Sequence, residues 1–274
     1  MVSILTARDN VVDCYFDEGR LFAGGNALNV AVHARRAGAR TAYAGTVGTD
    51  PAGAYIQSSL AREGVSTDFL QVRPGSTAYC VIERNDGDRV FREVGLGVSQ
   101  AEYDGGFLSP SSGFDAVHLS VSSLLEDLAP ELASVSRLSF DFSTKRDAAL
   151  LSAVAPHCYL ASFSGGDLTR PEALDLARRA TALGATWALV TRGAEGAVLA
   201  GREHTCEAPA ANTTVVDTLG AGDTFIATVL TELLKGTSPR EALAKASEAS
   251  ALTCSRLGAF GQGESLTAVP LPAG

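Results

Sequence analysis

The chain has 274 residues, of which 46% are hydrophobic and 19% are charged. That length supplies one large α/β domain, or at most two small ones, with a sizeable buried core. Acidic residues outnumber basic ones by 31 to 22, which gives a formal net charge of −9. A chain this acidic is a poor match for nucleic acids and for anionic membranes, so we expect its partners to be small molecules.

The hydropathy and cysteine patterns indicate the compartment of the protein and the kind of metal ion that it can use. No run of about 18 apolar residues is present, so we expect no transmembrane helix. Residues 1–8 do not resemble a secretory signal. The five cysteines contain no C-x-x-C pair, and the four histidines show no H-E-x-x-H spacing. We therefore expect reduced thiols in a cytoplasmic protein, and any metal ion must be a hard cation held by oxygen atoms.

Short apolar runs alternate with longer amphipathic segments along most of the chain. Segments with helical spacing include residues 171–183, which Thr169 can cap. Short buried strands between such helices predict βαβ units and a mainly parallel central sheet. The predicted strands of this sheet include residues 41–46, 116–120, 138–142 and 187–191.

Two stretches interrupt this alternation and predict a smaller β-sheet. Residues 11–16 form a predicted strand that follows another after almost no gap. Further along, the runs 77–84 and 89–94 flank the sequence Asn85-Asp86-Gly87-Asp88, and an Asp-Gly turn between alternating runs is a strong hairpin signal. These pieces are expected to cover the carboxyl ends of the parallel strands, where open α/β sheets bind ligands.

The domain organisation follows from these patterns. We predict a single domain over residues 1–274, with a small β lid contributed by about residues 11–22 and 68–96. Residues 266–274 contain two prolines and no apolar period, so they are expected to form a loose tail.

The junction before the apolar helical pattern of residues 226–235 carries a candidate for chemistry. A strand that ends near Val216 is expected to meet a helix that begins near Ala221, with Gly220 and Gly222 at the junction. Glycine lets the N–H groups of the helix start point outward, and together with the positive end of the helix dipole they form an anion site.

Asp223 is expected in the first turn of that helix, beside the anion. Two explanations are open for this carboxylate. It can cap the helix and complement its dipole, which is worth about 0.5–2 kcal/mol. Alternatively, it can take a proton from a hydroxyl group that attacks a bound phosphoryl group.

Two motifs give the chain a resemblance to a known family. Residues 217–225, DTLGAGDTF, look like the C-terminal signature of the ribokinase/PfkB carbohydrate kinases, and residues 24–31, GGNALNVA, resemble the family's diglycine motif. Residues 47–50 and 191–197 follow the expected order, so the resemblance spans roughly residues 3–262. It implies a ribokinase-like three-layer α/β fold with a mainly parallel central sheet and a small β-sheet lid. It also implies an ATP-dependent carbohydrate kinase that uses Mg²⁺ with ATP.

The resemblance also implies roles at the C-terminal motif. Asp223 would be the catalytic base for the attacking hydroxyl group. The amides of Gly220, Ala221 and Gly222 would stabilise charge on the transferring γ-phosphoryl group. Preorganised donors of this kind contribute ~10²–10³ each in rate, and a positioned base contributes roughly 10²–10⁴.

On the sugar side, Asp13 and Asn29 look like the family's sugar-binding pair. Polyols are commonly bound by a carboxylate that accepts hydrogen bonds from two neighbouring hydroxyl groups. Gly24 and Gly25 would let the sugar approach the backbone. Asp13 can instead stabilise a turn, Asn29 can cap a helix, and the two glycines can form a plain turn.

On the nucleotide side, Thr191, Gly193 and Gly196 match a family loop that follows a core strand. Their T-x-G-x-x-G spacing is also compatible with a simple β-turn. The apolar residues before and after this loop favour the nucleotide-binding interpretation.

The chain departs from the family pattern in two places. Arg8 stands where the family usually has glycine, and the family's Asn-x-x-Glu motif is replaced by Ser164-Gly165-Gly166-Asp167. Asp167 can organise metal-bound water, or it can cap the helix that follows. Family members often use a monovalent cation such as K⁺, for which the backbone of residues 257–259 is a candidate.

Within the family, the chain is most similar to the branch of bacterial fructoselysine 6-kinases. This implies phosphorylation of the terminal 6-hydroxyl group of a fructosamine such as fructoselysine. Arg92, on the predicted hairpin, can bind a carboxylate of the substrate's amino-acid part, or it can be a solvated surface charge. The segments that carry this likeness are residues 9–13, 24–32, 88–91 and 140–143.

Two other functions remain open from the sequence. The chain can be another kinase of the same family, acting on a ketose, a 2-keto-3-deoxy sugar acid or a nucleoside. It can also be a catalytically silent sugar-binding or regulatory protein, although such a protein has no chemical need for Asp223. Exposed strand edges tend to pair, so the lid also suggests a homodimer.

Overall fold

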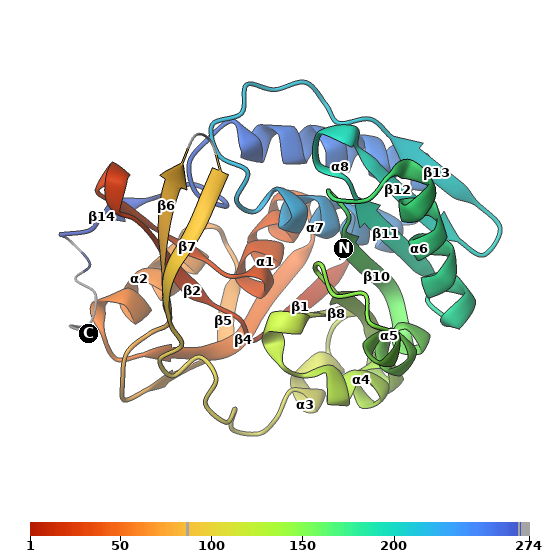
Figure 1. Ribbon diagram of the computed structural model, residues 1–274. Helices are drawn as coiled ribbons and strands as arrows, with labels where there is room; N and C mark the ends of the chain where they lie inside the picture. The colour runs from red at the N-terminus through yellow and green to blue at the C-terminus, as the bar shows by residue number, and fades with distance from the viewer. Residues whose placement is uncertain (86–87, 268, 270–274) are drawn as a thin grey trace.

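Nine short strands form the central sheet of the computed structural model, which describes residues 1–85, 88–267 and 269 (Figure 1). Neighbouring strands are parallel except at β11–β12 and β12–β13, which are antiparallel. The predicted, mainly parallel sheet is therefore confirmed. In spatial order the strands are β13 (Thr205–Ala208), β12 (Ala197–Gly201), β11 (Trp187–Thr191), β10 (Cys158–Ser164), β9 (Arg137–Asp141), β8 (Ala116–Ser120), β1 (Ser3–Ala7), β4 (Arg40–Gly48) and β5 (Ser66–Arg73).

Helices cover both faces of this sheet because successive strand residues point to opposite faces. Ile4 and Leu5 of β1, for example, are both fully buried but belong to different hydrophobic clusters. The result is the expected three-layer α/β arrangement. One face carries α1 (Asn26–Arg36), α2 (Pro51–Arg62), α7 (Ala221–Leu234) and α8 (Pro239–Cys254), and the other carries α3 (Leu108–Ser111), α4 (Ala129–Val135), α5 (Ala148–Val154) and α6 (Arg170–Leu183).

A second sheet of five strands forms the lid, packed around Tyr15, Phe22, Cys80 and Ile82. Its predicted extent needs correction at one end. Residues 66–73 pair with β4 in the large sheet, so the lid does not begin at residue 68. The Asp86-Gly87 turn lies outside the described residues. In spatial order the lid strands are β14 (Glu264–Ser265), β3 (Arg20–Gly24), β2 (Val11–Tyr15), β6 (Tyr79–Asn85) and β7 (Asp88–Gly95).

Two further expectations need correction. No strand ends near Val216; this residue lies in an irregular segment, where its N–H donates to the carbonyl oxygen of Cys254. The expected loose tail is held against the core at its start, because Leu266 packs on a hydrophobic cluster and Val269 is only 6% exposed. The remainder of that tail, residues 268 and 270–274, lies outside the described residues.

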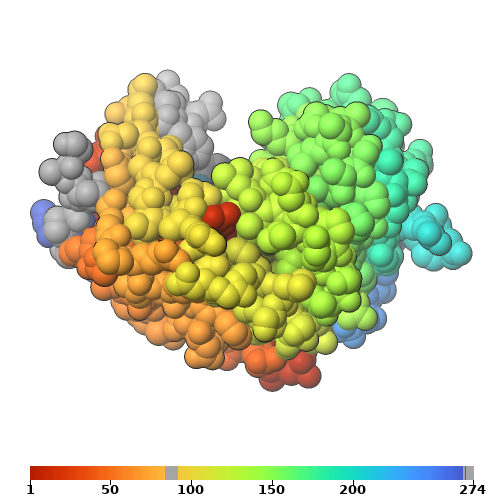
Figure 2. Space-filling view, turned by 90° about the horizontal axis from the view of Figure 1, so that it is seen from below, coloured from red at the N-terminus to blue at the C-terminus, as the bar shows by residue number. Residues whose placement is uncertain are grey.

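The carboxyl ends of the parallel strands and the N-termini of α1 and α7 meet at one edge of the large sheet. In Figure 1, α1 and α7 lie side by side at the centre of the molecule, between the lid and the strands β8 to β11. The space-filling view shows a hollow between the yellow part of the chain, on the lid side, and the green part, which includes β9 and β10 (Figure 2). None of the helices in the described part of the chain combines the length and apolar composition that crossing a membrane requires.

Candidate active site

The first turn of α7 is held in a shape that only glycine permits. Gly220 precedes the helix with a φ of +75°, and a Cβ atom there would lie 2.6 Å from the Cβ of Ala259. Gly222 differs, because a Cβ atom at its position would meet nothing within 4 Å. The N–H groups of a first helical turn have no acceptor in a preceding turn. The N–H of Ala221 is an exception, because it donates to the carbonyl oxygen of Thr218 at 3.2 Å. The N–H of Gly222 lies beside an open space.

Asp217 fixes the loop that leads into α7. One carboxylate oxygen, Oδ1, accepts a hydrogen bond of 3.0 Å from the N–H of Leu219. The other, Oδ2, accepts bonds from the N–H of Gly258 at 3.0 Å and from the hydroxyl group of Tyr15 at 2.7 Å. The first aspartate of the DTLGAGD motif thus connects this loop to the lid and to the chain segment after α8.

Asp223 lies in the first turn of α7 and faces the first turn of α1. The side-chain amide of Asn26 donates to its Oδ1 at 2.8 Å, and the amide of Asn29 donates to its Oδ2 at 2.7 Å. The two asparagines are three residues apart and therefore lie on one face of the helix. Hydrogen bonds donated to a carboxylate favour its ionised form.

The Asn26 amide also reaches a second carboxylate. Its nitrogen donates to Oδ2 of Asp141 at 2.9 Å, and its oxygen lies 3.0 Å from Nε2 of His118. The other ring nitrogen of His118 lies 2.9 Å from the hydroxyl oxygen of Ser139. Complete burial lowers the pKa of His118 to about 3, so this ring is neutral.

Two carboxyl groups around the start of α1, those of Asp141 and Asp9, hold their protons more tightly than usual. Burial, followed by the charge of Asp223, raises the pKa of Asp141 to about 7, although the N–H of Ser143 opposes this shift. Burial raises the pKa of Asp9 to about 6, against hydrogen bonds from the amides at the start of α1. One of these is the 2.8 Å bond from the N–H of Asn26, so Asp9 holds the end of α1 that carries the two asparagines.

The sugar-side residues predicted from the sequence come together next to this network. Asp13 of β2 is 4% exposed, and a Cβ atom at Gly24 would lie 2.0 Å from its carboxylate. Gly25 adopts a φ of +103°, and a side chain there would collide with the carbonyl oxygen of Asp9. Asn29 is 3% exposed, and its side-chain oxygen has no hydrogen-bond partner among the described residues. A buried acceptor is thus available for a ligand hydroxyl group.

Two cavities adjoin at the start of α7. One, of about 350 Å³, includes Asn26, Asp141, Gly220 and Asp223 in its wall. The other, of about 410 Å³, contains all three residues predicted for nucleotide binding. Thr191, Thr218 and Gly222 line both cavities, so a group held at Gly222 can be reached from either side. The larger cavity is lined by Thr191, Gly193, Gly196, Thr218, Gly222 and Phe225, among others.

Comparison with known proteins identifies the family. The sequence profile of the pfkB family of carbohydrate kinases matches residues 4–132 and 159–263. The chain belongs to this family. It is therefore an ATP-dependent sugar kinase, as the sequence motifs predicted.

Curated relatives and solved structures agree with this assignment. The kinase is 39% identical to "Fructosamine kinase FrlD" of Bacillus subtilis over 267 residues, which cover 96% of this chain and 94% of the relative. It is 35% identical to "Fructoselysine 6-kinase" of Escherichia coli, covering 95% and 100%. A crystal structure of an E. coli protein described as a ribokinase II, in complex with ATP and Mg²⁺, superposes with a TM-score of 0.79 at 20% identity, covering 95% of each chain.

Asp167, the predicted metal residue of this kinase, forms a salt bridge with another side chain. The guanidinium group of Arg146 donates to both of its carboxylate oxygens, at 2.8 and 2.7 Å. This pairing lowers the pKa of Asp167 to about 2. A metal ion at Asp167 would have to displace Arg146 or share the carboxylate with it, so the structure does not bring Asp167 into the site as a free ligand.

Arg92, predicted to bind the substrate, is paired with another residue of the lid. Its Nε donates to Oε2 of Glu83 across the lid hairpin at 2.6 Å. The two side chains are 50% and 41% exposed. Arg92 thus forms an ion pair at the surface of the lid, which favours the alternative of a surface charge, and its binding of a substrate carboxylate stays a prediction.

Sequence reasoning missed three contributors to the network around Asp223. Asn26 was noted only as part of the diglycine motif, and His118 and Asp141 were noted only within strands. A signal for Asp141 was available, because it is an acidic residue at the carboxyl end of a buried strand. No comparable signal marks His118, since its partner is a hydroxyl group on the neighbouring strand.

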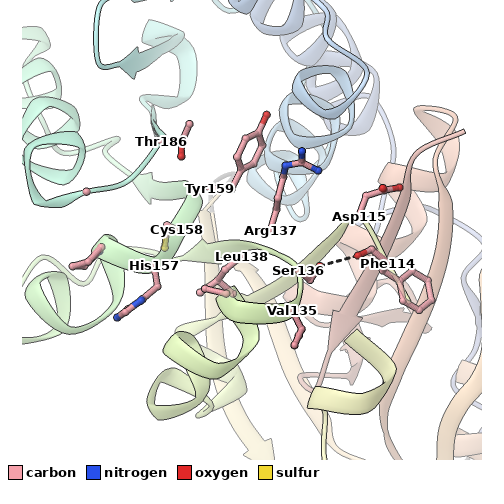
Figure 3. A pocket seen from close by; sticks show the side chains of 13 residues that line it. Phe114, Asp115, Val135, Ser136, Arg137, Leu138, His157, Cys158, Tyr159 and Thr186 are labelled. Atoms are coloured by element: carbon pink, nitrogen blue, oxygen red, sulfur yellow. Dashed lines mark hydrogen bonds between the residues drawn. The ribbon is translucent and has the colours of Figure 1, made fainter. Parts of the chain in front are cut away.

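A third hollow of the kinase, of about 580 Å³, lies at the opposite end of the strands (Figure 3). It is lined by residues that begin β9 and β10, such as Arg137 and Tyr159, whereas Asp141 ends β9. The Arg137 guanidinium lies over the Tyr159 ring, 5.6 Å from its centroid, and Asp115 accepts bonds from the N–H and hydroxyl groups of Ser3. These side chains are engaged with one another, and the hollow is not part of the site around Asp223.

Proposed function

We propose that this kinase transfers the γ-phosphoryl group of ATP to the 6-hydroxyl group of a fructosamine such as fructoselysine. The observation that carries the proposal is the position of Asp223 beside Gly222, where the two cavities adjoin. The printed names of the relatives at 39% and 35% identity support the substrate class.

Asp223 acts as the base in this proposal. The attacking hydroxyl group lies in the 350 Å³ cavity and gives its proton to a carboxylate oxygen of Asp223. The new bond joins the hydroxyl oxygen to the γ-phosphorus, and the bond between that phosphorus and the β–γ bridging oxygen breaks, releasing ADP. Asn26 and Asn29 favour the ionised, proton-accepting form of Asp223, because each donates a hydrogen bond to one of its oxygens.

The start of α7 acts as the anion site. The amides of Gly220 and Gly222 stabilise the charge that develops on the transferring group, and the amide of Ala221 joins them by exchanging its 3.2 Å bond to the Thr218 carbonyl oxygen for one to the phosphoryl group. The open space beside Gly222 supports this role, since a phosphoryl group can approach the backbone there without meeting a side chain. The positive end of the α7 dipole adds to the attraction.

The sugar is held by residues of the lid and of the start of α1. Asp13 accepts hydrogen bonds from its hydroxyl groups, and the unpartnered side-chain oxygen of Asn29 accepts another. Gly24 and Gly25 keep this wall of the site free of side chains. A side chain at Gly24 would collide with the carboxylate of Asp13, and one at Gly25 would collide with the carbonyl oxygen of Asp9. This close packing supports a binding site here rather than a plain turn.

ATP occupies the 410 Å³ cavity, with Thr191, Gly193 and Gly196 in its wall. Mg²⁺ bound with ATP supplies charge neutralisation at the phosphate oxygens. Within the described residues, no group of three or more Asp, Glu, His or Cys side chains could hold a metal ion alone. So few protein ligands fit a metal ion that is bound mainly by the nucleotide's phosphates and water.

Two further parts of the proposal concern a monovalent cation and assembly. A K⁺ ion near residues 257–259 stays a prediction, and the carbonyl oxygen of Ala259 there already lies 2.9 Å from Nε2 of His33. A homodimer through the lid is supported by the edge strand β7 and by Val94 and Leu96, which are 58% and 57% exposed. Light scattering on the purified chain and on Val94→Lys tests this dimer.

A coupled assay that measures ADP release tests the substrate. Fructoselysine and other fructosamines are compared with fructose, ribose, adenosine and 2-keto-3-deoxygluconate, and phosphorus NMR locates the phosphate on the product. We expect the highest kcat/KM with a fructosamine and phosphate at the 6-position. Turnover of a different substrate alone indicates another kinase of the family, and binding without turnover of any substrate indicates a silent sugar-binding protein.

A further inference from the structure

His118 is a buried titratable group that the proposed reaction does not use. It lies on β8 with no exposed surface and is paired in register with Ser139 of β9. Its two ring nitrogens contact Ser139 on one side and the side-chain oxygen of Asn26 on the other. Burying a polar ring costs free energy unless its nitrogens are hydrogen-bonded, and both nitrogens of His118 are. Such satisfied buried networks hold their members in fixed positions.

The donors and acceptors of these side chains fix the direction of each hydrogen bond from Asp223 through Asn26 and His118 to Ser139. The ionised carboxylate of Asp223 only accepts, so the nitrogen of the Asn26 amide must face it, and this nitrogen also donates to Asp141. The amide oxygen then faces Nε2 of His118, and this nitrogen must carry the ring's proton. Because the ring is neutral, Nδ1 has no proton and accepts a bond from the Ser139 hydroxyl group.

The opposite orientation of the amide would be unfavourable at both ends. Its oxygen would lie against the carboxylate of Asp223, and its two N–H groups would face a ring nitrogen that can accept only one of them. We propose that His118 and Ser139 are positioning residues of this kinase: they hold the Asn26 amide in the orientation that donates to both Asp223 and Asp141. This inference rests on the proposed role of Asp223 as the base.

The consequence is a control over the proton affinity of Asp223. The groups that face it include the amides of Asn26 and Asn29, the carboxyl group of Asp141 and the start of its own helix. The charge of Asp9 also acts on Asp141. Losing the fixed Asn26 bond removes one hydrogen-bond donor from Asp223 and one from Asp141. The loss of the donor to Asp223 raises the pKa of the base.

Three variants separate positioning from simple packing. His118→Leu removes both ring hydrogen bonds while keeping an apolar side chain of moderate size. His118→Gln keeps a donor near the place of Nε2, so it is the conservative variant. Ser139→Ala removes only the outer bond, which relaxes the choice of ring tautomer. Thermal unfolding of each variant reports how far packing alone is disturbed.

The pH profile of kcat is the first readout. In His118→Leu we expect the acidic limb to move to higher pH by about one unit, the size expected for one lost hydrogen bond to a charged group. His118→Gln should restore the wild-type profile, and Ser139→Ala should give a smaller shift of the same sign. A His118→Leu enzyme with the wild-type acidic limb, or a shift that Gln reproduces in full, would overturn the inference.

A second readout does not depend on activity. Carbon-13 NMR of the aspartate carboxyl groups follows the titration of Asp223 in the wild-type chain and in His118→Leu. A raised Asp223 pKa in the variant supports positioning even if no tested sugar is phosphorylated, and an unchanged pKa rejects it. If His118→Leu does not fold, the same comparison is made with Ser139→Ala. Absence of sugar kinase activity in the wild type counts against the proposed function only.

Discussion

Tyr15 and Asp217 are 202 positions apart in the sequence, yet the Tyr15 hydroxyl group donates a 2.7 Å hydrogen bond to Oδ2 of Asp217. Tyr15 is at the end of lid strand β2 and is 1% exposed, and Asp217 begins the loop that leads into α7. The same carboxylate holds the N–H groups of Leu219 and Gly258. The lid is therefore bonded directly to the segment that forms the candidate anion site.

Tyr15→Phe tests this connection. Removing one donor from a buried carboxylate should lower the free energy of unfolding by about 1–3 kcal/mol, measured in urea. We also expect a lower kcat, because the loop before Gly220 loses one of its fixed points. Tyr79→Phe is the matched control: Tyr79 bonds Glu93 on the lid at 2.5 Å, near the surface, and its loss should cost less than about 1 kcal/mol. Equal effects of the two substitutions on kcat would contradict the proposed connection.

Gly222→Ala separates folding from phosphoryl transfer. A methyl group at Gly222 meets nothing within 4 Å, and alanine is favoured over glycine within a helix by roughly 0.5–1 kcal/mol. Thermal stability should therefore stay the same or rise. The same methyl group stands where the two cavities adjoin, so kcat/KM for ATP should fall by about ten-fold or more.

Gly113→Ala serves as the control for this experiment. A Cβ atom at Gly113 makes only an ordinary contact, 3.6 Å from the carbonyl oxygen of Pro110, in a turn remote from both cavities. The Gly113→Ala substitution should leave kcat/KM for ATP unchanged. A Gly222→Ala enzyme of normal activity would argue that phosphate does not approach the backbone there.

The elements that were predicted from the sequence are those with local signals. Helix α6 begins at Arg170, after a capping box in which Thr169 pairs with Glu172, and Pro171 stands in its first turn. The strand predicted at residues 187–191 matches β11 because five consecutive residues with apolar character suit a buried strand. Start signals and periodicity act over a few residues, so the surrounding fold does not override them.

The errors arose where distant contacts decide the structure. Val215 and Val216 have the β-branched side chains of a strand, but they are 61% and 37% exposed. The Val216 N–H bonds to Cys254 at the end of α8 instead of to a strand. The network of Asn26, His118 and Asp141 was missed for the same reason, because only the strand order β9-β8-β1 brings these residues next to α1.

Asp141→Asn is expected to change the pH dependence of stability. The pKa of Asp141 is raised to about 7 in the folded state, against about 3.9 for an unfolded chain. Between these values the folded state binds more protons, so its stability relative to the unfolded state falls as pH rises from about 4 to 7. Replacing the carboxyl group with an amide removes this fall.

The measurement is the difference in unfolding free energy between Asp141→Asn and the wild type. Over pH 4 to 8 this difference should increase in favour of the variant, by roughly 1–4 kcal/mol. Asp9, whose pKa is raised to about 6, leaves a residual slope of the same sign in both proteins. Asp175→Asn, on the exposed side of α6, should show no such trend. If the unfolding free energies of Asp141→Asn and the wild type changed in parallel with pH, the pKa of Asp141 would not be raised in the folded state.

Asp223→Asn addresses the base itself. An amide cannot accept the proton of the attacking hydroxyl group, so kcat should fall by ~10²–10⁴. The remaining contacts of the nucleotide cavity are unchanged, and calorimetry should give an ATP affinity within about three-fold of the wild type. Asp115→Asn, in the hollow at the opposite end of β8, changes a carboxylate that accepts hydrogen bonds from Ser3 and should retain full turnover. If Asp223→Asn kept a tenth or more of the wild-type kcat, another group would have to accept the proton.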